Sequence, residues 1–392
     1  MREVRANGAA AALLRAGARV APTADDVERL RTAVSRVRDW DAALALAGRH
    51  HVVPLVARQL AASAADVVPA RALDAFQATS RAIAAGALVL AGELARIVAA
   101  LEAQGVRALP YKGPALALAA YGDTGMRECE DLDVVVPPAD YARARKTLLA
   151  LGYRSLRALS PAQEAVVYGG QGHAPFERAD REALLVVELH WRFAARRFPW
   201  NPRLDDLLAR AASLPIGGVR VALPAREDHL LLLLLHGTRH RWERLEWAAS
   251  VSALLAGGPV DGGVLLARAA RVGGTRAALV GLQVARRVLG APVSEELLAR
   301  ADHDAAVEPL AREAIARMFA PPDEAAGRDG EREFHRRCLE RPLDRARFLA
   351  LSVLLPTPRE WELVRLPGVL APLYVPIRIG RLVLRGAQSE GE

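Results

Sequence analysis

The sequence has very little cysteine, and this scarcity excludes one class of protein. Cys129 and Cys338 are the only cysteines among 392 residues, and they lie far apart. Secreted proteins built on disulfides carry many closely spaced cysteines, so this class is excluded. The hydrophobic fraction is 52% and the charged fraction 25%, which is typical of a globular protein with a sizeable core. The abundance of Ala, Leu and Arg predicts a mostly helical fold.

Two apolar stretches in the C-terminal half are too short or too interrupted to cross a membrane. A spanning helix needs about 20 apolar residues, whereas the run Leu230–Leu235 is short, and prolines and arginines interrupt residues 369–384. The N-terminal apolar run is broken by Arg15, which argues against a signal peptide. We therefore expect a cytoplasmic protein without membrane insertion.

Acidic residues are fewer than basic ones, 45 against 53, which gives a formal charge of +8. This excess favours anionic partners such as nucleotides. We favour arginine spread over solvated helix faces over a dedicated nucleic-acid surface.

The order of predicted elements divides the chain into three regions. The pattern predicts an N-terminal helical region over residues 1–104 and a C-terminal helical domain over residues 201–392, with a disordered tail after Arg385. Between them, residues 105–200 alternate short strands with short helices. The expected strands are 106–109, 132–136, 166–168, 173–178 and 183–191. The predicted class is α+β, mostly helical, with a small mixed-sheet core.

The stretch from Leu109 to Val136 concentrates the groups that suggest chemistry. If residues 131–133 are extended, the period of two places the carboxylates of Asp131 and Asp133 on one face. Neighbouring carboxylates resist ionisation unless a cation lies between them. Mg2+ (or Mn2+) suits this position, because Mg2+ binds one or two carboxylates and completes its shell with water and substrate phosphates.

The start of the same stretch suggests a phosphate contact. Gly113 lets the backbone approach a ligand closely, and Pro114 suits the first position of a helix. Helix N-termini bind phosphate through free N–H groups, and Lys112 adds a mobile positive charge there.

The strongest predicted strand, residues 183–191, carries a third acid. Its alternation places Glu188 and His190 on one face. A carboxylate in so apolar a strand needs a partner, and we pair Glu188 with the ion at Asp131 and Asp133. We interpret His190 as a packing or supporting residue. His173 could touch substrate, although a solvated loop histidine is the favoured interpretation.

Two further histidine pairs invite a metal hypothesis. His236 and His240 are four residues apart and would share a helix face with Glu243. The sequence lacks the internal Glu of zinc proteases, so we favour a polar face that lines a central cleft. The adjacent His50 and His51 are interpreted as a helix end.

Taken together, these motifs resemble the uncharacterised nucleotidyltransferase family of the DNA polymerase-β-like superfamily. The resemblance rests on Lys112-Gly113 before a small-residue helix, on Arg127 four residues before the Asp-x-Asp strand, and on Glu188 followed by Leu-His-Trp. It implies that Asp131, Asp133 and Glu188 are catalytic and hold the metal. Lys112 and Gly113 would contact the triphosphate, and Arg127 would neutralise phosphate charge or orient the acidic strand.

The sequence also departs from this pattern. Pro114 stands where the superfamily usually has Ser or Gly, so a hydroxyl contact to phosphate is lost. The third acid is Glu188 where many relatives use Asp, and Ser250 stands where the family often has an acid.

The resemblance implies transfer of an NMP group from an NTP, with ATP as the expected nucleotide, to an unidentified hydroxyl-bearing acceptor. The acceptor class stays open among a small molecule, a peptide and a protein, and nucleic acid is less favoured. The alternatives are a non-catalytic NTP-binding regulatory module and kinase-like phosphoryl transfer in a biosynthetic pathway.

Overall fold

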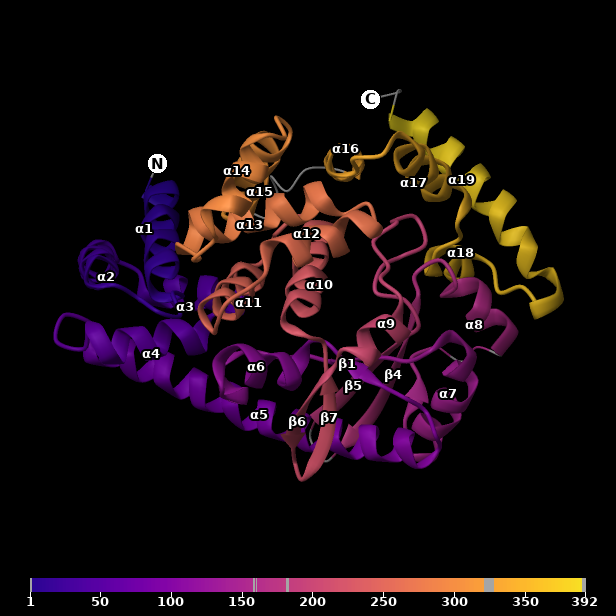
Figure 1. Ribbon diagram of the computed structural model, residues 1–392, viewed down its shortest axis with the longest axis horizontal. Helices are drawn as coiled ribbons and strands as arrows, with labels where there is room; N and C mark the ends of the chain where they lie inside the picture. The colour runs from indigo at the N-terminus through magenta and orange to yellow at the C-terminus, as the bar shows by residue number, and fades with distance from the viewer. Residues whose placement is uncertain (1, 158, 160, 181–182, 321–327, 390–392) are drawn as a thin grey trace.

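The computed structural model describes residues 2–157, 159, 161–180, 183–320 and 328–389. Helices at both ends of the chain surround a small sheet (Figure 1). The predicted α+β, mostly helical class with a mixed-sheet core is therefore confirmed.

The N-terminal helices form where the sequence supplies caps. They are α1 (Arg2–Gly17), α2 (Ala24–Arg36), α3 (Trp40–Arg49), α4 (Val53–Ser63) and α5 (Ala70–Ala103). Thr23 and Asp26 cap α2 reciprocally, and Asp39 accepts a hydrogen bond from the first turn of α3. Among the described residues, α5 is the helix long and apolar enough to cross a membrane. Here it packs against α4, α6 and β7.

The central sheet has the strand order β1-β2-β5-β4-β3. Its strands are β1 (Leu109–Pro110), β2 (Leu132–Val135), β3 (Arg154–Ser155), β4 (His173–Asp180) and β5 (Ala183–His190). The pair β2 and β5 is parallel, and the other pairs are antiparallel. The predicted strands at 132–136, 173–178 and 183–191 are confirmed, whereas the strand predicted at 106–109 begins only at its last residue.

The helices of this region are α6 (Gly113–Tyr121), α7 (Tyr141–Ala150) and α8 (Pro161–Val167). The prediction of a strand at 166–168 is wrong, because these residues end α8 and begin the turn that follows it. Val167 and Tyr168 are both buried in the sheet's core. Consecutive buried apolar residues at a helix end imitate a short strand.

The region after residue 201 contains an unpredicted hairpin as well as helices. After α9 (Leu204–Ala209), strands β6 (Ala212–Ile216) and β7 (Val219–Leu223) pair in antiparallel fashion. Gly217 and Gly218 both have positive φ angles, as tight hairpin turns require. The helices that follow are α10 (Arg226–Arg239), α11 (Leu245–Ala256), α12 (Gly262–Arg271), α13 (Thr275–Leu289), α14 (Glu295–Asp302), α15 (Val307–Met318), α16 (Arg328–Cys338), α17 (Pro342–Leu354), α18 (Pro358–Leu363) and α19 (Tyr374–Ser389).

Three apolar clusters hold the described elements together, and two of them are large. The larger core joins N-terminal residues such as Leu14 and Phe76 to Trp242 and Phe334 of the C-terminal part. The second core packs the sheet, including Val187, against α5. The two ends of the chain are therefore held together around the face of the sheet that carries the polar residues.

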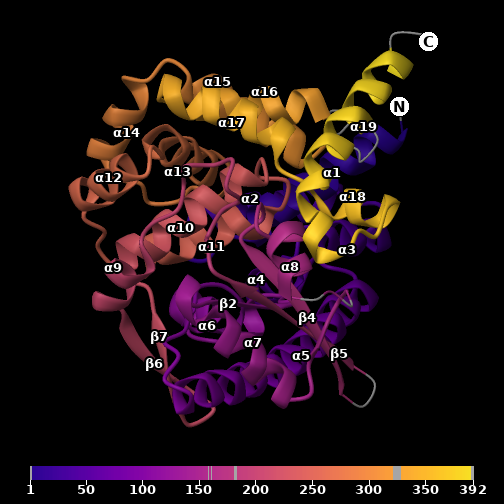
Figure 2. The same cartoon turned by 90° about the vertical axis from the view of Figure 1, so that its right-hand side faces the viewer.

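The last helices pack beside the sheet. Figure 2 shows α18 and α19 next to α8, and Trp361 and Tyr374 are buried in the sheet's own core. The 3-10 helix at Gly368–Leu373 contacts α8. The prediction of a disordered tail after Arg385 is wrong as far as Ser389, where α19 ends, and residues 390–392 lie outside the described residues.

Candidate functional site

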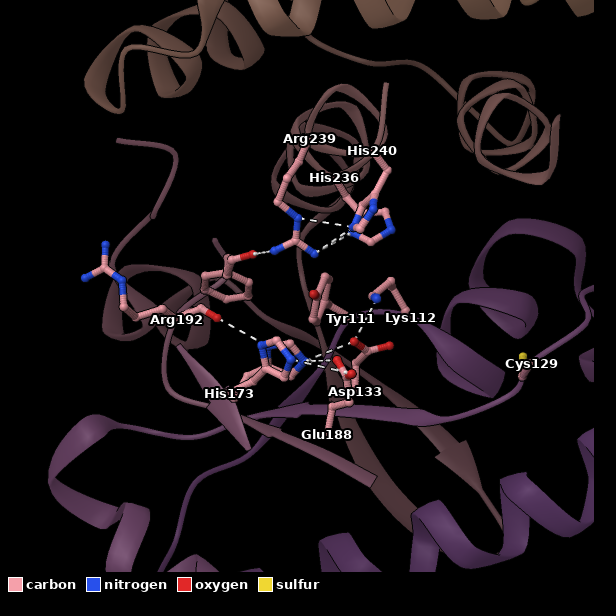
Figure 3. Close-up of polar contacts among 12 residues, drawn as sticks. Tyr111, Lys112, Cys129, Asp133, His173, Glu188, Arg192, His236, Arg239 and His240 are labelled. Carbon is pink, nitrogen blue, oxygen red and sulfur yellow. Dashed lines mark hydrogen bonds and ion pairs between the residues drawn. The ribbon is translucent and has the colours of Figure 1, made fainter. Parts of the chain in front are cut away.

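A polar cavity of about 420 Å³ lies between the sheet and helices α10 and α11. Its lining contains most of the side chains that the sequence selected, which are Lys112, Arg127, Asp131, Asp133, His173, Glu188, His236 and His240. Figure 3 shows Asp133, Glu188 and His173 on the sheet side, opposite His236 and Arg239 of α10 and His240 directly after it. Gly113 and His190 adjoin this lining through Lys112, Asp133 and Glu188.

Strand pairing brings two of the acids together. In the parallel pair of β2 and β5, Asp133 is in register with Glu188. The residues between and beside them, Val134, Val187 and Leu189, point into the sheet's core. Because side chains alternate along a strand, the burial of the apolar set fixes both acids on the opposite face.

Lys112 contacts the acid of β2 directly. Its Nζ lies 2.7 Å from Oδ1 of Asp133, and both side chains are largely buried. Burial opposes the charge on each, yet the attraction between them raises the pKa of Lys112 and, with His190, holds the pKa of Asp133 well below its usual range. Lys112 is thus an internal counter-ion in this structure as well as the predicted phosphate contact.

Asp131 has no directly bonded counter-ion, although the charges of Lys112 and Arg127 act on it from a distance. Among the described residues, its carboxylate has neither a hydrogen bond nor an ion pair. Burial, and then the charge of Asp133, raise the pKa of Asp131 to about 7. The negative charge of the cluster is therefore only partly compensated by the protein itself.

His190 connects the two strands. Its Nε2 lies 3.1 Å from Oδ1 of Asp133 and 3.1 Å from Oε2 of Glu188, while Nδ1 lies 3.3 Å from the carbonyl of Arg192. Burial alone would lower the pKa of His190, but the hydrogen bonds to the two carboxylates raise it. The favoured interpretation of His190 as a supporting residue matches this position.

His173 is the first residue of β4, so the solvated-loop interpretation is wrong. Its ring stacks on that of His190 at a centroid distance of 4.8 Å. Its Nε2 lies 3.6 Å from Oε1 of Glu188. Burial, and then the neighbouring His190, lower the pKa of His173 to about 4, which makes it a neutral group at the edge of the acid cluster.

Arg127 forms a buried ion pair that the sequence did not reveal. Its Nη2 lies 2.6 Å from Oε1 of Glu246 on α11, and both side chains are at most 9% exposed. Glu246 is one helical turn before Ser250, where an acid was expected. The ion pair ties the loop before β2 to α11 in the helical part of the chain.

His236 and His240 line the cavity, as the favoured interpretation of a polar face expects, and the disfavoured metal triad with Glu243 does not form. Helix α10 ends at Arg239, so Glu243 lies beyond the helix and pairs with Arg241 instead. The Arg239 guanidinium lies 3.3 Å from Nδ1 of His236 and 3.1 Å from Nε2 of His240. Burial and nearby cations hold the pKa of both histidines well below the usual range.

Other cavity residues were missed or interpreted differently. His51, interpreted only as a helix end, lines the cavity and lies 3.7 Å from Glu246. Tyr111 is fully buried, and its ring packs edge-on against that of His190. Burial raises the pKa of Tyr111 to about 12. Tyr111 adjoins the acidic cavity rather than lining it, and a single tyrosine between Pro110 and Lys112 gives no sequence signal for such a position.

The charge of the lining fits a divalent cation. Its acidic residues outnumber its lysine and arginine residues. The acids are Glu128, Glu130, Asp131, Asp133, Glu188, Glu243 and Glu246, and the bases are Lys112, Arg127, Arg239 and Arg244. Carboxylate oxygens are the ligands that Mg2+ and Mn2+ prefer. His173, Glu188 and His190 also have potential ligand atoms within 4.8 Å of one another. The uncompensated Asp131 gives the cluster an open position for positive charge.

Comparison with known proteins identifies one family. A family model described as uncharacterised nucleotidyltransferase matches residues 36–290, which is more than half of the chain. Among solved structures, an antigenic nucleotidyltransferase-like protein from Paracoccidioides brasiliensis is similar, with 18% identity and a TM-score of 0.37. That match covers 56% of this chain and 97% of the other. No curated protein shows a significant match.

Proposed function

This chain belongs to the uncharacterised nucleotidyltransferase family, and we propose that it transfers an NMP group from an NTP, with ATP as the expected donor, to a hydroxyl-bearing acceptor. The proposal includes a requirement for Mg2+ or Mn2+. The observation that carries it is the register of β2 and β5, which places Asp133 beside Glu188. Asp131 lies just before β2 and has no direct ion pair.

The three acids would hold the cation. A divalent ion bound there supplies charge stabilisation for the transferred phosphoryl group and the leaving pyrophosphate, and it lowers the pKa of the acceptor hydroxyl. Glu188 and Asp133 are kept in place by His190, whose Nε2 they share. Pre-positioned acids of this kind reduce the reorganisation needed during the reaction.

The start of α6 would receive the phosphates of the nucleotide. Gly113 has a φ angle of +61°, and a Cβ atom built there would lie 3.6 Å from the carbonyl of Asp131. That distance is an ordinary contact, so it is the positive φ angle, which side chains other than glycine rarely adopt, that favours glycine where the helix begins beside Asp131. No side chain caps the helix and Pro114 has no N–H group, so the N–H groups of Gly113 and Ala115 would bind phosphate oxygens together with Lys112.

The test is a titration followed by a product assay. Each NTP is titrated by calorimetry with and without Mg2+, and the products are then analysed with a panel of hydroxyl compounds. We expect magnesium-dependent binding and release of pyrophosphate. Release of NDP or orthophosphate would instead indicate kinase-like chemistry or hydrolysis, and binding without any product would indicate a regulatory module.

A further inference from the structure

A second cavity, of about 520 Å³, lies between the sheet region and helices α16 to α19. Arginine dominates its charged lining, which consists of Arg157, Arg197, Arg332, Arg359, Arg378 and Arg381 with only Glu331 and Glu362. This composition is the reverse of the acidic cavity beside β2. Glu362 pairs with Arg157, and the buried Glu360 pairs with Arg378 and Arg381. The positive charge that remains after these pairs is best satisfied by an anion.

Several of these guanidinium groups have bonding capacity to spare. Within the described part of the chain, Arg197 and Arg359 form neither a hydrogen bond nor an ion pair. Burial, together with Arg239 and Arg378, lowers the pKa of Arg197 even though Glu331 opposes this. Arg381 holds Glu360 through Nε at 2.7 Å, but its Nη1 is buried without a partner.

A third cavity, of about 280 Å³, connects the arginine cavity to the acid cluster. It shares His173, Arg239 and His240 with the acidic cavity. It shares Gln171, Arg197 and Arg378, among others, with the arginine cavity. A ligand anchored at the arginines could therefore extend past His173, whose Nε2 is 3.6 Å from Glu188.

We propose that the arginine cavity binds a phosphate group of the acceptor, so that the acceptor is a phosphorylated small molecule. This inference rests on the proposed nucleotidyl transfer. Guanidinium groups bind phosphate through paired N–H donors, and several converging arginines suit a dianion. A cavity of about 520 Å³ is within the size range of small-molecule sites. The acceptor hydroxyl would lie at the acid cluster, while the nucleotide phosphates occupy the start of α6.

The test uses glycerol 3-phosphate as a phosphate ester with free hydroxyls, and glycerol as its uncharged control. Binding to the full chain is measured by calorimetry in EDTA. The variants are Arg197→Gln and Arg359→Gln. Neither arginine forms an ion pair within the described residues, so its replacement leaves no carboxylate unpaired. Arg36→Gln on α2, an exposed arginine outside the cavity, removes the same charge as a matched control.

We expect glycerol 3-phosphate, but not glycerol, to bind the unmodified protein and Arg36→Gln equally. Arg197→Gln should weaken binding about tenfold, because a lost charged hydrogen bond typically costs that factor. Asp131→Asn should leave this binding unchanged, and Mg·ATP affinity should be unchanged in Arg197→Gln. Equal binding by Arg197→Gln, or no binding of glycerol 3-phosphate at all, would overturn the inference.

Two outcomes separate the inference from the proposed function. If Mg·ATP displaces glycerol 3-phosphate and loses affinity in Arg197→Gln, the arginines bind the nucleotide's own phosphates and the assignment to the acceptor is wrong. If glycerol 3-phosphate binds as expected but no NTP binds with Mg2+, the proposed nucleotidyl transfer fails. In that case the arginine cavity is still a phosphate-binding site, but its assignment to the acceptor of a nucleotidyl transfer is wrong.

Discussion

Asp133 and Glu188 share one hydrogen-bonding partner, since Nε2 of His190 lies 3.1 Å from a carboxylate oxygen of each. The parallel register of β2 and β5 places these acids side by side. One buried imidazole therefore links two strands that are distant in sequence. A change at any of the three residues alters the charge that the other two experience.

Asp131→Asn is expected to stabilise the metal-free protein while removing metal binding. The pKa of Asp131 is raised to about 7 in the folded state. Above that pH the carboxylate is charged in both states, and its charge costs more free energy in the folded protein than in the unfolded chain. We expect the free energy of unfolding at pH 8 to rise by about 1–3 kcal/mol, and Mn2+ affinity to fall strongly. Urea unfolding in EDTA and Mn2+ calorimetry measure the two effects.

The exposed Asp74 on α5 supplies the control for this experiment. Asp74→Asn should change stability by less than about 0.5 kcal/mol and leave Mn2+ binding unchanged. A destabilised Asp131→Asn protein would contradict the assignment of Asp131 as an uncompensated charge.

Glu188→Gln is expected to reduce pyrophosphate release by about 100-fold or more while preserving the fold. The amide keeps a hydrogen-bonding group toward His190 but loses the charge that a cation requires. Glu177→Gln on the neighbouring strand is the matched control, since Glu177 pairs with Arg154 outside the acidic cavity. Equal activity of both variants would remove Glu188 from the site.

The buried pair between Arg127 and Glu246 is expected to show strong coupling. Glu246→Leu leaves a buried guanidinium without its counter-ion and should lower the free energy of unfolding by about 3–5 kcal/mol. The double variant Arg127→Met with Glu246→Leu should recover most of this loss, because it buries no unpaired charge. Urea unfolding of the single and double variants gives the coupling energy, and additive losses would refute it.

His229 makes stability depend on pH. Its Nε2 donates a hydrogen bond to the carbonyl of Tyr111 at 2.7 Å, and burial lowers its pKa from 6.5 to about 4. The unfolded chain therefore binds the proton more readily, so stability is full above pH 6.5 and falls as the pH drops towards 4. Between pH 7.5 and 5.0 this residue should account for about 2 kcal/mol of lost stability.

His229→Gln isolates this contribution, because it retains a donor but does not titrate. The variant should be less stable at pH 7.5, yet its stability should change about 2 kcal/mol less between the two pH values than that of the unmodified protein. Urea unfolding at both pH values measures the difference. An unchanged pH dependence would show that His229 is not the titrating group.

The sequence determined the local part of this structure. Alternation in residues 132–136 and 183–191 fixed which side chains face the core, because a strand exposes successive residues on opposite faces. Caps such as Thr23 and Asp39 marked helix starts. The family resemblance, carried by a few short motifs, is confirmed over residues 36–290. The Gly217-Gly218 pair between alternating apolar residues is also a local hairpin signal.

Only the tertiary structure decided which distant residues meet. The pairing of Arg127 with Glu246, the sharing of His190 by Asp133 and Glu188, and the gathering of arginines around α16 to α19 depend on contacts between elements far apart in the chain. Helix ends had the same dependence, since the turn after Arg239 removed Glu243 from its expected face. Periodicity along the chain indicates which face of a helix or strand is buried, but it does not indicate which other element packs against that face.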